Sequence, residues 1–304
     1  MDKRKHHYIP RFYLSKFIDP VCISTKDPYL WVFKHGATES HKKSPKNCAV
    51  LTGFNDVRLK DGTVSVDVED NLAKLESEAA KIYKKIERHD ILGDRDRVIF
   101  SEFIWAMQMR TPYQRENTNR IYKEIDLMIL RISASHPEYL KRILTECNEQ
   151  NEPPSDEEVK KLQEIIAAGE FDLNIPQEYS IINMAEHAQE MSKIISKMNW
   201  GFMIAPEGLN FITSDNPVII KDPNNKSKFF GDGYLSSRTI ELTFPLTPKM
   251  CLLATWKVLS GDYTEVDRES IFVVNDRTCK YSHQYIFSSQ RLYLSADDNR
   301  LYFQ

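Results

Sequence analysis

Residues 239–255 read TIELTFPLTPKMCLLAT and contain two apolar runs of strand length, 239–244 and 250–255, with prolines between them. β-branched and aromatic residues favour strands, whereas glycine and proline bound them. Similar runs occur shortly before this pair, at residues 200–204, 210–213 and 218–220. Residues 200–255 are therefore expected to supply most of a β-sheet.

The middle of the chain has helical periodicity instead. In residues 68–86 the apolar side chains recur every three or four positions, which is the spacing of one helix face. These positions are Val68, Leu72, Leu75, Ala79, Ile82 and Ile86. A second helix is expected over residues 94–110. Pro112 suits the first turn of a third helix, which continues to residue 134.

Two more helices are expected after the polar, proline-broken segment 149–156. Ser155 and Glu158 have the spacing of a capping box for a helix that ends at Ala168, and helical periodicity returns over 176–198. The remaining expected elements are a short helix at 12–17, strands at 29–33, 49–54 and 285–288, a turn at 60–62 and a helix at 272–283. The fold class is therefore α+β, a central helical segment with a mainly antiparallel sheet formed by N-terminal and C-terminal strands.

Length and composition favour one globular, cytoplasmic domain over residues 1–300. The chain has 304 residues, of which 41% are hydrophobic and 28% charged, enough for a large core or two small ones. No run approaches the roughly 18 apolar residues of a membrane helix, and the basic start has no apolar signal region. Five scattered cysteines favour reduced thiols. Residues 301–304, LYFQ, match a cleavage-tag remnant, although they could be native.

Charge is unevenly distributed. Residues 1–60 contain 12 Lys and Arg but 5 Asp and Glu, so the rest of the chain carries a net charge of −10. This excess permits a nucleic-acid or nucleotide partner. Basic runs are also common on solvated faces, so the pattern does not require one.

The N-terminal segment holds the most unusual local cluster, His6, His7, Tyr8 and Arg11. Imidazole titrates near neutrality and can act as a base or metal ligand, and guanidinium binds anions. Neighbouring histidines rarely face the same way, so at most one is expected to point into a site. Equally, the segment could be a packed or solvated start of the chain.

Other candidate polar side chains lie on the predicted helices and turns. Glu69 and Glu76 are nearly two helical turns apart, roughly 10 Å, too far to bridge one metal directly. Arg110 ends a helix, where a cation is favoured by the dipole. Asp215 and Asn216 occupy a turn between two apolar strands. They could form a hairpin turn or present catalytic groups, with Asp215 as a base or metal ligand. His283 is a further candidate residue for the same site.

Four segments, in this order, resemble the bacterial DUF4238 family, a domain of unknown function: HHYIPRFYLSKF, EDNLAKLES, MQMRTPYQR and FITSDNPV. The resemblance extends over about residues 5–290. It implies a mostly bacterial, cytoplasmic setting and, more loosely, a link to anti-phage defence. It supplies positions but no mechanism. The family pattern falls on His6 or His7, Tyr8, Pro10, Tyr13, Glu69, Glu76, Arg110, Pro112, Asp215, Asn216, Pro217 and Asn275.

Two functions are compatible with these residues. One is a metal-dependent phosphodiesterase or nuclease that uses Mg²⁺ or Mn²⁺, with Arg110 holding a phosphate oxygen. Its catalytic residues would be His6, His7, Arg110 and Asp215, and its metal ligands His7, Glu76 and Asp215. The alternative is a non-catalytic sensing or binding module in which the same residues form a buried polar network. Common nucleotide, zinc-protease and serine-hydrolase motifs do not occur in the sequence.

Overall fold

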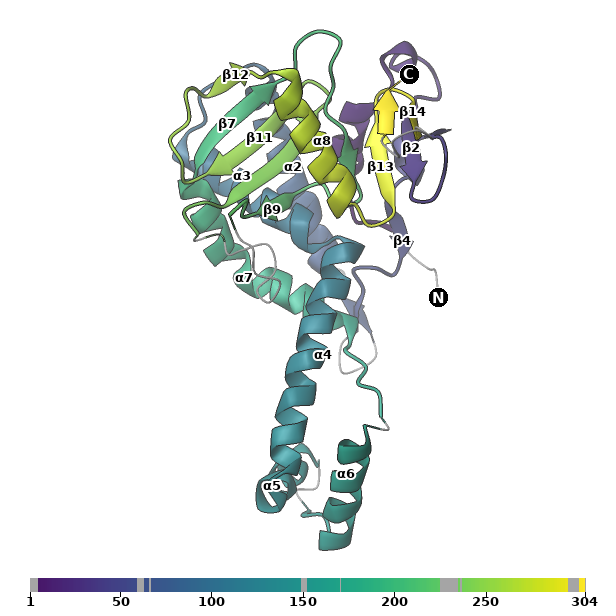
Figure 1. Ribbon diagram of the computed structural model, residues 1–304, viewed down its shortest axis with the longest axis vertical. Coiled ribbons are helices and arrows are strands. Elements are labelled where there is room, and N and C mark those ends of the chain that lie inside the picture. Colours follow the sequence, from purple (N-terminus) through teal and green to yellow (C-terminus); the bar gives the residue numbers. More distant parts are fainter. Residues whose placement is uncertain are drawn as a thin grey trace. The chain divides into compact units, whose positions relative to one another are not determined.

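The two runs of residues 239–255 form the central hairpin of a five-stranded sheet, β10 (Glu241–Thr247) paired with β11 (Met250–Thr255). The computed structural model describes residues 5–58, 63–65, 67–148, 152–169, 171–224, 235, 237–294 and 301–303. The expected turn at 60–62 lies outside them. The strand order is β12-β7-β11-β10-β9, and all neighbours are antiparallel except the parallel pair β12 and β7 (Figure 1).

A second, four-stranded sheet joins the two ends of the chain. Its order is β3-β2-β13-β8, all antiparallel. The predicted combination of N-terminal and C-terminal strands is therefore found in this sheet, whereas the larger sheet comes only from the C-terminal part. The α+β class is confirmed, but the single predicted sheet is divided into these two sheets, and the described residues also contain three two-stranded pairs, β1 with β4, β5 with β6 and β14 with β15.

The bounds of the elements agree closely with most of the expected ranges. The helices are α1 (Arg11–Leu14), α2 (Asp67–Glu87), α3 (Asp94–Met109), α4 (Pro112–Ala134), α5 (Pro137–Cys147), α6 (Asp156–Ala168), α7 (Gln177–Lys197) and α8 (Arg268–Tyr281), with short 3₁₀ turns η1 (Ser15–Phe17), η2 (Pro20–Cys22) and η3 (Pro45–Asn47). The other strands are β1 (Lys5–His7), β2 (Leu30–Lys34), β3 (His41–Lys43), β4 (Val50–Thr52), β5 (Val57–Arg58), β6 (Val64–Ser65), β7 (Asn199–Ile204), β8 (Thr213–Ser214), β9 (Ile219–Lys221), β12 (Tyr263–Glu265), β13 (Tyr285–Ser288), β14 (Leu292–Leu294) and β15 (Leu301–Phe303).

The largest difference concerns the turn at Asp215. Residues 210–212 are not a strand, and β8 has two residues. β8 pairs with β13 in the smaller sheet, while β9 pairs with β10 in the larger one. The segment that was expected to be a hairpin turn is instead the crossing between the two sheets.

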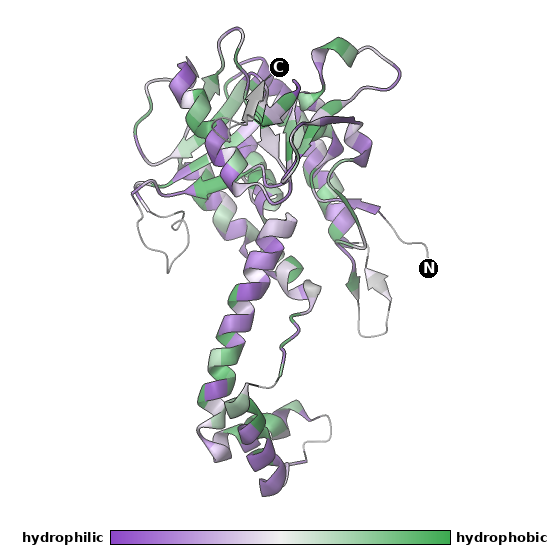
Figure 2. Cartoon of the chain, turned by 45° about the vertical axis from the view of Figure 1, so that its right-hand side comes forward, coloured by the Kyte–Doolittle hydropathy of each residue, from purple (hydrophilic) through white to green (hydrophobic). Residues whose placement is uncertain are grey.

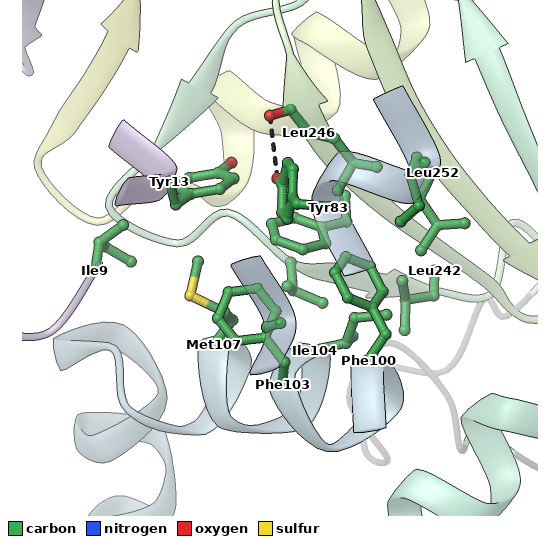
Figure 3. Packing of buried hydrophobic residues seen from close by; sticks show 14 of the residues in the cluster. Ile9, Tyr13, Tyr83, Phe100, Phe103, Ile104, Met107, Leu242, Leu246 and Leu252 are labelled. Atoms are coloured by element: carbon green, nitrogen blue, oxygen red, sulfur yellow. Dashed lines mark hydrogen bonds between the residues drawn. The ribbon is translucent and has the colours of Figure 1, made fainter. Parts of the chain in front are cut away.

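Contacts divide the chain into two compact units, Met1–Gln114 with Ile181–Gln304, and Arg115–Ser180. The first unit contains both of these sheets. Its core is aromatic where α2 and α3 meet the sheet, as Phe100 and Phe103 pack beside Tyr83 (Figure 3). The Tyr83 hydroxyl donates to the carbonyl oxygen of Leu246 at 3.0 Å, and this bond is drawn in Figure 3.

The second unit consists of helices. α4 is followed by α5, which the sequence analysis did not anticipate, and by α6. The predicted capping box is present, since Ser155 accepts from the Glu158 N–H and Glu158 accepts from the Ser155 N–H. Gln163 on α6 donates to the carbonyl oxygen of Ala134 at the end of α4. None of the helices in the described residues is long and apolar enough to cross a membrane.

Candidate functional site

The two N-terminal histidines lie on β1 and face opposite ways, as adjacent strand residues do. His6 is buried, and its Nδ1 accepts a hydrogen bond from the Asn55 N–H at 3.0 Å. Its proton is then on Nε2, 3.7 Å from Asp56 Oδ1. His7 is half-buried, with Nε2 3.2 Å from the carbonyl oxygen of Lys46.

The two glutamates of α2 hold different partners. Glu69 accepts a hydrogen bond from the side-chain amide of Asn55, and its Oε1 is 3.7 Å from His6 Nδ1. Glu76 accepts from Nη1 of Arg110 at 2.7 Å. Arg110 is 1% exposed and caps the C-terminus of α3, so this ion pair ties α3 to α2. The Nε of Arg110 has no hydrogen-bond partner in the described chain.

The carboxylate of Asp215 accepts three backbone hydrogen bonds. One carboxylate oxygen accepts from the His283 N–H at 2.8 Å, and the other accepts from Gln284 and Tyr285 at 2.7 and 2.9 Å. Burial raises the pKa of the Asp215 carboxyl, and these three N–H donors and the nearby His283 oppose that shift. The carboxylate therefore fastens the crossing between the sheets to the segment that enters β13.

The N-terminal motif does reach this region. Burial, and next the charge of Asp215, raise the pKa of the Tyr8 hydroxyl. Tyr13 on α1 is fully buried; its hydroxyl donates to the carbonyl oxygen of Pro245 at 2.7 Å and is 2.5 Å from Thr213 Oγ1. These bonds fix the N-terminal helix to both sheets.

The two asparagines of the family pattern also bind backbone. Asn216 donates to the carbonyl oxygen of Tyr281 at 2.8 Å. Asn275 on α8 accepts from the Ile212 N–H at 3.0 Å and donates to the carbonyl oxygen of Asn210 at 2.9 Å. Asn216 thus binds a carbonyl at the C-terminal end of α8, and Asn275 binds backbone groups outside the strands.

The structure does not bring the predicted metal ligands His7, Glu76 and Asp215 to one place. Among the described residues, no three His, Cys, Asp or Glu side chains are grouped so that they could hold a metal ion. Arg11 is exposed on α1, and His283 is half-buried and contributes its N–H to Asp215. His6, Arg110 and Asp215 instead form hydrogen bonds with three different parts of the fold.

A cavity of about 330 Å³ lies elsewhere, between α8 and one face of the larger sheet. Ser270, Val273, Val274 and Arg277 line it from α8, because positions i, i+3, i+4 and i+7 share a helix face. The opposite wall comes from β7, β10 and β11, through Met203, Glu241, Thr243 and Leu253. The lining combines apolar side chains from both walls with Arg277 on the helix side and the Thr243 hydroxyl and Glu241 carboxylate on the sheet side.

Two polar atoms of this lining are buried and have no partner in the described chain. The Arg277 side chain is 10% exposed, and its Nη2 donates to Glu241 at 3.0 Å, but its Nη1 has no hydrogen-bond partner. Thr243 is 2% exposed, and its Oγ1 has none either. Glu241 is shared with Lys257 at 3.2 Å. Leaving such groups unpaired costs about 1–3 kcal/mol each, so the arrangement favours a bound acceptor.

The rim of the cavity is acidic. Asp267 caps α8, accepting from the Ser270 N–H at 2.8 Å, and hydrogen bonding to Ser270 lowers the pKa of its carboxyl. Glu269 lies beside it and is exposed. A ligand in this cavity would therefore meet the Arg277 guanidinium and its partner Glu241 at one end, and the carboxylates of Asp267 and Glu269 at the other.

A larger cavity of about 610 Å³ is basic. Lys193, Lys197 and Arg238 line it together with Glu190 and the half-buried ring of Trp256. Cationic side chains beside an aromatic ring suit phosphates and bases. Unlike the α8 cavity, its lining includes no buried polar atom without a partner in the described residues.

Sequence comparison assigns the family. The chain matches, over residues 5–291, the model of the family described as protein of unknown function (DUF4238), and it belongs to that family. No curated protein and no solved structure matches it.

Sequence reasoning missed Arg277, Thr243 and Glu241. The alternation of Glu241 and Thr243 with apolar residues in TIELTF was a usable signal, since it places both side chains on one face of β10. The sequence signal for Arg277 was weaker, and consisted of its position on the same helix face as Ser270. Nothing in the sequence indicated that α8 would cover this face.

Proposed function

We propose that this protein is a non-catalytic sensing or binding module that holds a small molecule in the cavity between α8 and the larger sheet. One observation carries the proposal: Arg277 Nη1 and Thr243 Oγ1 are buried without hydrogen-bond partners in the described residues, and both residues line the same cavity. A ligand oxygen at that point would satisfy both groups. A cavity of this volume is at the small end of ligand sites.

The chemistry of the lining favours a zwitterionic, amino-acid-like ligand. Its carboxylate would accept from Arg277 and Thr243, a charge-assisted pairing that guanidinium geometry suits. Its ammonium group would lie beside the carboxylate of Glu241, which lines the cavity next to Arg277, because both charged groups of an α-amino acid are attached to the same carbon. An apolar side chain would pack on the aliphatic wall, which includes Leu253.

The test is a thermal-shift panel of the twenty common amino acids, with acetate and phosphate as partial ligands. The Arg277→Met and Arg268→Met proteins are compared with the unchanged protein. Arg268 is an exposed arginine on the same helix that does not line the cavity, so it is a matched control. One or more apolar amino acids should raise the melting temperature of the unchanged protein and the Arg268→Met protein, but not of Arg277→Met. An equal shift in all three, or none in any, would sink the proposal.

The other predicted function, metal-dependent cleavage of a phosphodiester, stays a prediction, as do the nucleic-acid partner, the cytoplasmic setting and the defence role. It is checked by incubating the protein with Mg²⁺ or Mn²⁺ and an RNA and DNA panel. Cleavage that the His6→Ala/His7→Ala and Asp215→Ala proteins lack would favour the nuclease over the binding module. Folding of both variants is verified by circular dichroism first.

A further inference from the structure

Helix α4 carries an apolar stripe that the described residues leave exposed. Its members are Ile121, Ile125, Met128, Ile129 and Ile132, which are between 42% and 57% exposed. The stripe forms an arc roughly 100° wide on the helix. Figure 2 shows hydrophobic positions interspersed along α4.

The other side of α4 is already covered within its unit. Leu127 and Leu130 are half-buried, Ser133 is buried, and Gln163 of α6 binds the carbonyl oxygen of Ala134. The helix is thus apolar on two opposite sides, a pattern typical of a helix buried between two partners. One partner is the α5–α6 segment of the same unit. The second side has no cover in the described residues.

The spacing along the stripe identifies the kind of partner. Ile121, Ile125, Met128 and Ile132 follow one another at intervals of four, three and four residues, the heptad spacing of a seam between two helices. Such a seam is about 16 Å long. Because α4 is already helical, binding a partner would not carry the free-energy cost of forming this helix.

The charges beside the seam select the orientation and the occupant. Glu124 and Arg131 flank the stripe on one edge, and neither has an ion pair in the described chain. In an antiparallel pair of α4 helices centred between residues 126 and 127, each Ile121 meets an Ile132 and each Ile125 meets a Met128. The same register places each Glu124 opposite an Arg131 of the other copy. A parallel pair would place Glu124 beside Ile129 instead.

We infer that α4 is a self-association surface that binds a second copy of this chain in antiparallel orientation. The contact is isologous, so the apolar layers and the charge pair each occur twice. This surface is independent of the α8 cavity.

Sedimentation of the full chain over a range of concentrations tests the inference. The unchanged protein should dimerise, and Ile125→Asp should weaken dimerisation by about a hundredfold or more, since it buries a charge in the seam. Val258→Asp is the matched control, because Val258 is an apolar side chain 93% exposed outside the stripe. It should leave the dimer unchanged.

Charge reversal tests the orientation. Glu124→Arg alone and Arg131→Glu alone each convert both ion pairs to repulsions, so each should weaken the dimer by about tenfold. The double variant Glu124→Arg/Arg131→Glu restores the pairs with opposite polarity and should recover the original affinity. Both residues are exposed, so folding is unaffected. A monomeric unchanged protein, or a double variant as weak as the singles, would overturn the inference.

Discussion

Two arginines of the same unit, Arg110, which is buried, and Arg277, whose side chain is 10% exposed, differ in what surrounds them. Arg110 and Arg277 each donate to a glutamate of a neighbouring element, and each leaves one nitrogen without a partner in the described chain. Arg110, however, is enclosed among helices α2 and α3, whereas Arg277 lines a cavity together with the unpaired hydroxyl of Thr243. The comparison shows that burial and ion pairing do not distinguish a structural arginine from a binding arginine. What distinguishes Arg277 is that it lines a cavity together with a second polar group that has no partner in the described residues.

The largest effect is expected at Asp215, which belongs to the structural set. Asp215→Ala removes a buried carboxylate that accepts three backbone hydrogen bonds and should lower the free energy of unfolding by about 3 kcal/mol or more. Asp276→Ala is the control, because Asp276 forms a partly exposed i,i+4 pair with Lys280, and should cost about 0.5 kcal/mol or less. Urea denaturation measures both. Equal costs would contradict the structural role of Asp215.

Arg110 should come next. Arg110→Met leaves Glu76 without its partner, at a cost of about 2 kcal/mol, since Glu76 is 28% exposed and retains some solvent. Replacing both residues, Arg110→Met with Glu76→Met, removes the stranded charge as well. The double variant should therefore be more stable than the single one in the same urea titration. A single variant as stable as the unchanged protein would show that Arg110 contributes nothing to the core.

Arg277 should matter less for the free protein. Arg277→Met removes one hydrogen bond, while Glu241 keeps Lys257, so the free energy of unfolding should fall by about 1 kcal/mol or less. That is smaller than the cost at Arg110, measured under the same conditions without ligand. A cost as large as that of Arg110→Met would assign Arg277 to the structural set.

The fold was largely predictable because the local periodicity of apolar residues predicts its helices and its central hairpin. The face of α2, the capping box at Ser155 and the paired runs of 239–255 each depend on residues close in sequence. The division into two sheets was not predictable. It depends on β8 pairing with β13 rather than with β9, and such long-range pairings leave no local signal.

The candidate site was harder to predict for the same reason. Reactive residue types at His6, Arg110 and Asp215 suggested catalysis, but only their partners show that each holds backbone or a neighbouring helix. Thr243 was marked only by its place in an alternating strand and Arg277 by little local signal, and the two became a candidate site through the packing of α8 on the larger sheet. Whether a polar side chain has a hydrogen-bond partner depends on the folded chain. Sequence patterns therefore do not distinguish a structural polar residue from a binding one.

The most direct test is the smallest change, Thr243→Val, followed by thermal and urea unfolding with and without the amino acid that the panel selects. Valine keeps the shape of threonine and removes a buried hydroxyl that has no partner in the described residues. The free protein should gain stability, by up to about 1 kcal/mol, while the stabilisation by ligand should decrease. A loss of stability in the free protein, with an unchanged response to the ligand, would show that the hydroxyl serves the fold and not the cavity.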